Sequence, residues 1–104
     1  MVYTKQKYEN GDEKAPGMYF LREELDCENL GITVVDTDGE WEGIEHDHSE
    51  DEQEEVYLLV EGSGQITIDD DEVPLESGDA VRVAPGATRT VVFDEPSQMV
   101  IVGS

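Results

Sequence analysis

The sequence predicts an all-β fold, an antiparallel sandwich or barrel made by one domain. Short runs of apolar and β-branched residues follow one another at close spacing, and turn sequences such as Asp-Gly, Gly-Ser-Gly and Pro-Gly separate them. No stretch of the sequence has the length and periodicity of a long helix. With 104 residues, the chain can form one hydrophobic core but not two.

The N-terminal part of the chain divides at a turn. Residues 1–17 are polar and end in Ala-Pro-Gly, a common turn sequence. We therefore expect residues 1–17 to form an arm or an edge strand, and residues 18–104 to form the barrel. The apolar run 18–21 predicts a strand. Residues 22–30 predict one helical turn, because Leu21 and Leu25 are four positions apart.

Turn residues separate eight further predicted strands. Gly-Ser-Gly at 62–64 predicts a tight hairpin between its two neighbours. Three aspartates at 69–71 predict an acidic hairpin tip, because the ligand spacing of a calcium loop is absent. Pro74 predicts a strand at the edge of a sheet, because proline cannot donate to the ladder. The eight predicted strands are 32–36, 43–48, 55–61, 65–68, 72–75, 80–83, 88–93 and 98–102.

The charge balance excludes some partners. The chain has 27 Asp and Glu against 6 Lys and Arg, a formal net charge of −21. Nucleic acid is excluded, because binding phosphates requires clustered cations. Repulsion between acidic groups nearly vanishes at about 1 M salt, where the Debye length is about 3 Å. The composition therefore predicts a halophilic protein, whose melting temperature rises with KCl concentration.

The same sequence predicts a cytoplasmic protein that does not enter a membrane. No apolar run approaches the roughly 20 residues that a spanning helix needs. The first residues lack the apolar middle of a secretory signal. Cys27 is the single cysteine, so the chain forms no internal disulfide, which is typical of a reducing compartment.

Two histidines and a glutamate form a candidate metal site. His46 and His48 are two positions apart, so on a strand both imidazoles would point to the same side. Glu55 begins the next predicted strand and supplies a carboxylate. Two histidines and a carboxylate suit a divalent transition metal, and the sequence leaves Fe, Mn, Ni and Zn open. Tyr57 would share the face of Glu55, either lining the cavity or packing in the core.

These residues resemble the motifs of the cupins, and in particular the small conserved-barrel cupins. The first motif, His-x-His followed by Glu and Gly, corresponds here to His46, His48, Glu55 and Gly62. The second motif, Gly, a short strand, Pro and Gly, corresponds to residues 78–86. The resemblance covers roughly residues 31 to 102 and implies a single-domain, all-β, antiparallel jelly-roll barrel. It also implies a homodimer, with the N-terminal arm or an edge strand as the contact.

The chain departs from the cupin pattern in two places. Six residues separate His48 from Glu55, more than the resemblance implies, so Glu54 and Glu52 are kept as alternative ligands. The position of the third family histidine holds Arg89. Arginine stays protonated and cannot donate a lone pair to a metal.

Arg89 leaves two interpretations of the pocket open. In the first, His46, His48 and Glu55 bind the metal, and Arg89 binds a substrate carboxylate at the open side. In the second, Arg89 takes the place of the metal and pairs with Glu55. The corresponding functions are a metal-dependent enzyme acting on a small anionic molecule and a metal-free module that binds or senses a small molecule. A barrel that only associates with a partner protein is the third hypothesis.

Overall fold

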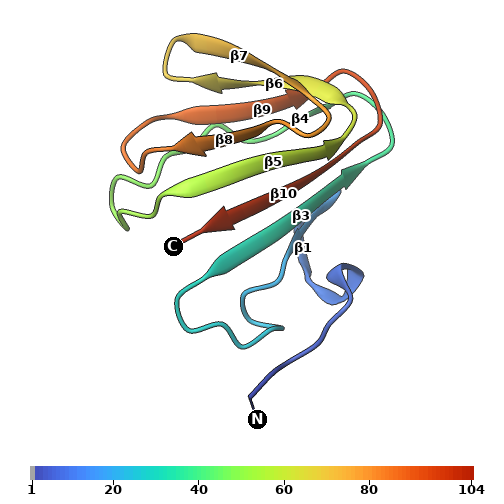
Figure 1. The fold of residues 1–104 in the computed structure, drawn as a ribbon, viewed down its shortest axis with the longest axis vertical. Helices are drawn as coiled ribbons and strands as arrows, with labels where there is room; N and C mark the ends of the chain where they lie inside the picture. The colour runs from blue at the N-terminus through green and yellow to red at the C-terminus, as the bar shows by residue number, and fades with distance from the viewer. Residues whose placement is uncertain (1) are drawn as a thin grey trace.

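The computed structural model describes residues 2–104, which form ten strands in two facing antiparallel sheets (Figure 1). The described residues contain one short 3₁₀ turn, η1 (Tyr8–Asn10), and no helix long and apolar enough to cross a membrane. The prediction of an antiparallel all-β fold is confirmed.

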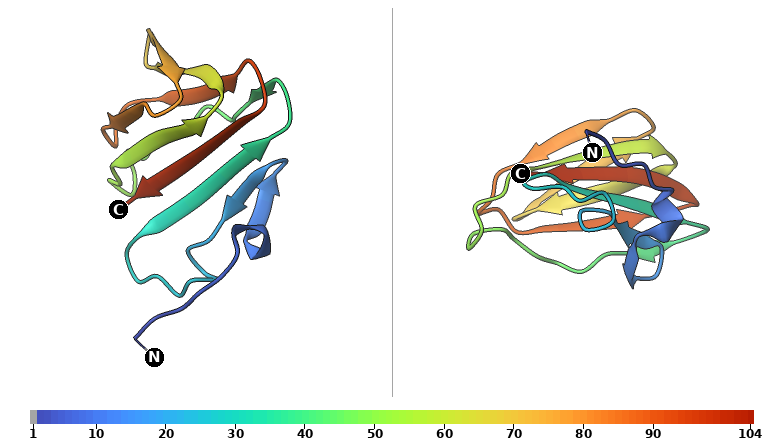
Figure 2. Two further views of the ribbon diagram at one scale, coloured as in Figure 1. Left: turned by 45° about the vertical axis from the view of Figure 1, so that its right-hand side comes forward. Right: turned by 90° about the horizontal axis from the view of Figure 1, so that it is seen from below.

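The larger sheet has six strands and the smaller sheet has four (Figure 2). In the larger sheet the order is β1 (Asp12–Ala15), β2 (Met18–Phe20), β3 (Gly31–Thr37), β10 (Ser97–Gly103), β5 (Glu55–Glu61), β8 (Ala80–Val83). In the smaller sheet it is β4 (Trp41–Glu42), β9 (Arg89–Phe93), β6 (Ser63–Ile68), β7 (Asp71–Glu76). Pro74 lies in β7, which is an edge strand as predicted.

The core lies between the two sheets, because each strand turns alternate side chains inward. On β5, Tyr57 and Leu59 are buried while Leu58 and Val60 are exposed. Met99 of β10 is fully buried. The whole buried cluster is Val35, Tyr57, Leu59, Ile66, Leu75, Val83, Val91, Phe93, Met99 and Ile101.

Gly62 marks a corner between the sheets, so the predicted hairpin of 55–61 with 65–68 is wrong. β5 pairs with β10 and β8, whereas β6 pairs with β7 and β9. Gly62 has a φ of 111°, and a Cβ there would overlap the Ser97 hydroxyl. Glycine is therefore required because the chain turns sharply against β10. The acidic hairpin tip predicted nearby is correct, since a two-residue turn joins Ile68 to Asp71.

The predicted strand at 43–48 is also wrong, because regular pairing ends at Glu42. From Glu42 to His46 the chain advances four residues, while its partner β9 advances three, from Val92 to Arg89. The extra residue interrupts the ladder, which resumes as a single bridge between His46 and Arg89. The predicted helical turn within 22–30 is a run of turns with one α-type hydrogen bond, Leu25 N–H to Leu21 O (2.9 Å).

The N-terminal residues add a hairpin to the edge of the larger sheet. β1 pairs with β2, and β2 pairs with β3. The Tyr8 hydroxyl donates to Asp36 Oδ2 (2.6 Å), and its ring packs edge-on against Tyr19. The indole N–H of Trp41 donates to the Pro16 carbonyl (3.0 Å), which ties the hairpin turn to the smaller sheet. These contacts place the hairpin over one side of the space between the sheets.

Candidate metal centre and its cavity

One of the three predicted ligands lies on a regular strand, and the other two lie on an irregular segment. Glu55 begins β5 and pairs with Val83 on one side and Gly103 on the other. His46 and His48 lie in the irregular segment after β4. His46 is positioned by its bridge to β9, and the His48 N–H donates to the Pro85 carbonyl (2.8 Å).

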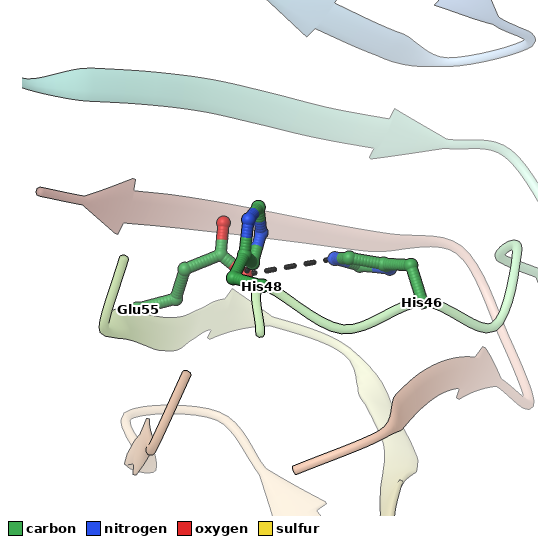
Figure 3. A group of neighbouring side chains, drawn as sticks. All are labelled: His46, His48 and Glu55. Atoms are coloured by element: carbon green, nitrogen blue, oxygen red, sulfur yellow. Dashed lines mark ion pairs between the residues drawn. The ribbon is translucent and has the colours of Figure 1, made fainter. Parts of the chain in front are cut away.

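The structure brings His46, His48 and Glu55 together (Figure 3). Their ligand atoms all lie within 4.8 Å of one another. Glu55 Oε1 is 3.3 Å from His48 Nε2 and 3.6 Å from His46 Nε2. The imidazoles therefore converge as the motif predicted, although the bridge to β9 produces the convergence, and not strand alternation.

The other ring nitrogens fix the tautomer of each histidine. His46 Nδ1 lies 3.1 Å from the Ile44 carbonyl, and His48 Nδ1 lies 3.0 Å from Asp51 Oδ2. Both partners only accept hydrogen bonds, so each Nδ1 must carry a hydrogen. In the neutral rings the lone pairs then reside on the two Nε2 atoms. Protein metal sites commonly orient their histidines in this way.

The convergence requires a positive species. Two Nε2 lone pairs and a carboxylate oxygen face one another, and His48 Nε2 is buried with no hydrogen-bond partner within residues 2–104. Buried acceptors without a donor are costly. A proton on a histidine would relieve the repulsion, and so would a bound divalent cation. The donor set and its geometry thus fit a metal ion such as Fe, Mn, Ni or Zn.

Two further groups approach the same carboxylate oxygen. The Tyr57 hydroxyl donates to Glu55 Oε1 (2.7 Å), and Arg89 Nη1 lies 3.7 Å from it. The Arg89 side chain is fully buried, and its Nη2 donates to the Ala84 carbonyl (2.7 Å). Arg89 Nε and Nη1 have no hydrogen-bond partner in the described part of the chain. Tyr57 is also only 1% exposed, so both side chains line the cavity beside Glu55 with almost no area open to bulk solvent.

The pKa values reflect this crowding. The Glu55 carboxylate raises the pKa of His46, and although burial opposes this, the Ile44 carbonyl adds to it. Burial alone would raise the pKa of Glu55, but contacts with His46 and Tyr57 outweigh it and lower the pKa below its ordinary value. Burial and the Glu55 carboxylate raise the pKa of Tyr57, so it remains a donor. The His48 imidazole lowers the pKa of Asp51.

A cavity of about 300 Å³ opens beside these residues. Its polar end is formed by the site, and the remaining wall is mostly apolar. The N-terminal hairpin forms one side of the cavity, and its contribution was not predicted. The lining residues of the hairpin are Lys14, Ala15, Met18 and Phe20.

The alternative ligands lie elsewhere. Glu54 pairs with Arg82 Nη2 (2.7 Å) on the outer side of the sheet, and Glu52 is exposed in the loop with a φ of 55°. Sequence reasoning missed Asp51, which orients His48. Its signal was available, since a carboxylate three residues after a ligand histidine can reach the second ring nitrogen.

Comparison with known proteins identifies the fold and its sequence family. The family described as the cupin domain matches residues 33–103. A cupin protein from Bacteroides fragilis superposes with a TM-score of 0.80 at 21% identity, covering 99% of this chain and 84% of that chain. KdgF from a Halomonas species gives a TM-score of 0.72 at 19% identity, covering 89% and 84%. A protein from Photorhabdus luminescens gives 0.74 at 16% identity, covering 99% and 87%. None of the curated proteins matches the chain significantly.

Proposed function

The chain belongs to the cupin family, and from that premise we propose that its barrel binds one divalent transition metal through His46, His48 and Glu55. We further propose that the adjoining cavity binds a small anionic molecule, on which the metal-loaded protein acts as an enzyme. The metal would be Fe, Mn, Ni or Zn, because these ions accept two imidazoles and one carboxylate.

One observation carries this proposal: the two Nε2 lone pairs and Glu55 Oε1 face one another at 3.3 and 3.6 Å. The hydrogen bonds at both Nδ1 atoms prevent the neutral rings from donating into this space. A cation is the species that such an arrangement stabilises best. The open cavity beside it leaves room for a ligand.

The residues of the chain would supply orientation and charge. A bound metal would act as a Lewis acid toward an oxygen of the ligand. Tyr57 would keep Glu55 in place through its hydrogen bond, and its raised pKa would keep its proton on the hydroxyl. Arg89 would compensate part of the Glu55 charge from the buried side. The apolar wall would exclude water from the rest of the ligand.

Elemental analysis of untagged protein tests the proposal with a matched pair of variants. We expect about one metal ion per chain in the wild type and in Glu54→Gln, whose carboxylate pairs with Arg82. Glu55→Gln removes the same charge one residue away and should lose the metal. A wild type that remains metal-free after exposure to Fe, Mn, Ni and Zn salts would contradict the proposal.

Arg89 supports a second candidate, a metal-free module that binds or senses a small molecule. Its guanidinium lies 3.7 Å from Glu55 Oε1 and already brings a positive charge to the site. In this case His46, whose side chain is half exposed, would be protonated and would supply the second positive charge. The metal analysis above separates the two candidates.

Two wider proposals concern the setting of the protein. The net charge of −21 supports a halophilic protein in a salt-rich cytoplasm, with a melting temperature that rises with KCl. The outer face of the larger sheet supports a homodimer, because Leu58 and Val60 are 36% and 50% exposed there. Light scattering over a KCl series tests both the dimer and its dependence on charge screening.

A further inference from the structure

Lys14 lines the cavity at an irregularity in β1. Glu13 pairs with Tyr19 and Ala15 pairs with Met18, so Lys14 is the extra residue of a β-bulge. In a regular strand Lys14 and Ala15 would point to opposite faces. Because of the bulge both of them line the cavity. Bulges of this kind often redirect a side chain beside a functional site.

Lys14 lacks the partner that its surroundings would predict. The chain has 27 acidic residues, yet within residues 2–104 no carboxylate lies within 4.0 Å of the Lys14 ammonium. Its Nζ lies 4.8 Å from the centroid of the Phe20 ring, which also lines the cavity. An aromatic ring positions a cation without neutralising it. The ammonium therefore keeps its charge available at the cavity.

The other two cations near the cavity are less accessible than Lys14. Arg89 is fully buried and donates to the Ala84 carbonyl. Arg22 donates to the carbonyls of Asn29 and Leu30. Lys14 is exposed, so of these three it is the one that a ligand can reach directly.

The distance between Lys14 and Glu55 limits the length of a molecule that could contact both residues. β1 and β5 are four strand spacings apart in the larger sheet, at most about 19 Å along the sheet. Long side chains from both strands extend into the cavity between them. The wall between Lys14 and Glu55 is largely apolar, with Met18, Phe20 and Val35 as examples.

We propose that Lys14 is a specificity-determining residue that binds the carboxylate of a small molecule whose apolar body fills the cavity between Lys14 and the His46–His48–Glu55 site. This inference rests on the proposed function and assigns its ligand class, a carboxylate with an aliphatic or aromatic body. It assigns carboxylate recognition to the N-terminal hairpin, which precedes the family match at residues 33–103. Arg89, the residue predicted for this role from the sequence, also lines the cavity, but it is fully buried and lies beside Glu55.

Calorimetric titration of paired probes tests this role. The probes are phenylacetate and hexanoate, each against its neutral amide, at about 1 M KCl so that the negative surface is screened. We expect each carboxylate to bind the wild type more tightly than its amide. Lys14→Met should weaken carboxylate binding by roughly tenfold or more, the effect of losing one charge-assisted contact, and leave the amides unchanged. Lys14→Arg should restore the preference.

Lys5→Met is the matched control, because it makes the same change in net charge at an exposed position that does not line the cavity. It should bind all four probes as the wild type does. Equal carboxylate affinity in Lys14→Met and the wild type would overturn the inference. So would a wild type that shows no preference for carboxylates, or that binds none of the probes at millimolar concentration.

A metal titration of the same variants separates this inference from the proposed metal site. Lys14→Met should bind metal as the wild type does, because Lys14 is not among the grouped ligands. A chain that binds no metal but keeps the Lys14-dependent preference would refute the metal site alone. A chain that binds metal without that preference would refute the role of Lys14 alone.

Discussion

The site has two halves that differ in how the chain holds them. Glu55, Tyr57 and Arg89 belong to strands, and the exposed fractions of their side chains are 13%, 1% and 0%. His46 and His48 belong to an irregular segment, and their side chains are 42% and 19% exposed. The strand-held half is therefore fixed by the fold, while the imidazole half depends on a few local hydrogen bonds.

This difference indicates where the affinity of the site can be adjusted. Strand residues move only when the sheet deforms, so their electrostatic contribution is constant. Segments with few buried contacts open locally at small free-energy cost. A ligand that joins the two halves would therefore stabilise the segment of His46 and His48 more than it stabilises β5.

The largest effect should follow from changing the strand-held half at Arg89. At an effective dielectric constant of about 20, two unit charges about 5 Å apart interact by roughly 3 kcal/mol, so Arg89 should weaken metal binding by about 100-fold or more. Arg89→His removes this charge and adds a third imidazole. We expect tighter binding of Zn or Ni by isothermal titration. Arg82→His, which breaks the surface pair with Glu54, is the control and should leave affinity unchanged.

A smaller effect should follow from loosening the imidazole half at Asp51. Its carboxylate holds His48 Nδ1 at 3.0 Å, and loss of such a partner typically lowers metal affinity by about 10–100-fold. Asp51→Asn should show this loss. Asp47→Asn removes an equal charge from the same loop, where Asp47 accepts only from Ser49 among the described residues, and should bind metal normally. Equal affinities in the two variants would mean that the loop needs no such support.

Acidification should weaken metal binding, because protons compete with the metal for His46. The Glu55 carboxylate raises the pKa of His46 above its ordinary value of 6.5. In the metal-free protein, the protonated imidazole stabilises the fold below pH 6.5, and this contribution is lost as pH rises through the raised pKa. Metal needs the free lone pair, so affinity should increase over that same rise, by at most about tenfold per pH unit. Glu55 has a pKa lowered from 4.5 and stays ionised throughout. A flat affinity between pH 6 and 8 (roughly the range of an ordinary histidine titration) would contradict this competition.

The smallest effect should come from outside both halves, at Tyr8. Its hydrogen bond to Asp36 raises the pKa of Tyr8 to about 12 from 10.0. The stabilising bond is present below pH 10.0 and is lost as pH rises through about 12. Ultraviolet titration should show a tyrosine that ionises at about pH 12, and this step should disappear in Tyr8→Phe. Metal affinity should not change in this variant, and a change would show that the N-terminal hairpin influences the ligands.

Much of the fold could be predicted because strands and turns have local signals. Residues 55–61 and 80–83 match β5 and β8, and Pro74 correctly indicated an edge. The Gly62 corner could not be predicted in this way. A glycine-rich turn looks alike whether it joins paired strands or passes between sheets, because the distinction depends on contacts with Ser97, which is distant in sequence.

The site was predicted in its composition but not in its geometry. The motif correctly grouped His46, His48 and Glu55, although the strand expected at 43–48 does not form. The bridge to Arg89 replaces it, and only the register with β9 reveals that bridge. The depth of Arg89 and the bulge at Lys14 likewise depend on packing and pairing, which local sequence does not encode.

The central place of β10 has a consequence for how the protein is made. β10 lies between β3 and β5, and Met99 pairs with both Val35 and Leu59. During translation, the edges of β3 and β5 that pair with β10 remain unpaired until residues 97–103 emerge from the ribosome. Because Gly103 pairs with Glu55, the backbone of Glu55 is paired on both sides only after that insertion. A nascent chain stalled before that point would expose two unpaired apolar edges, the state most prone to aggregate.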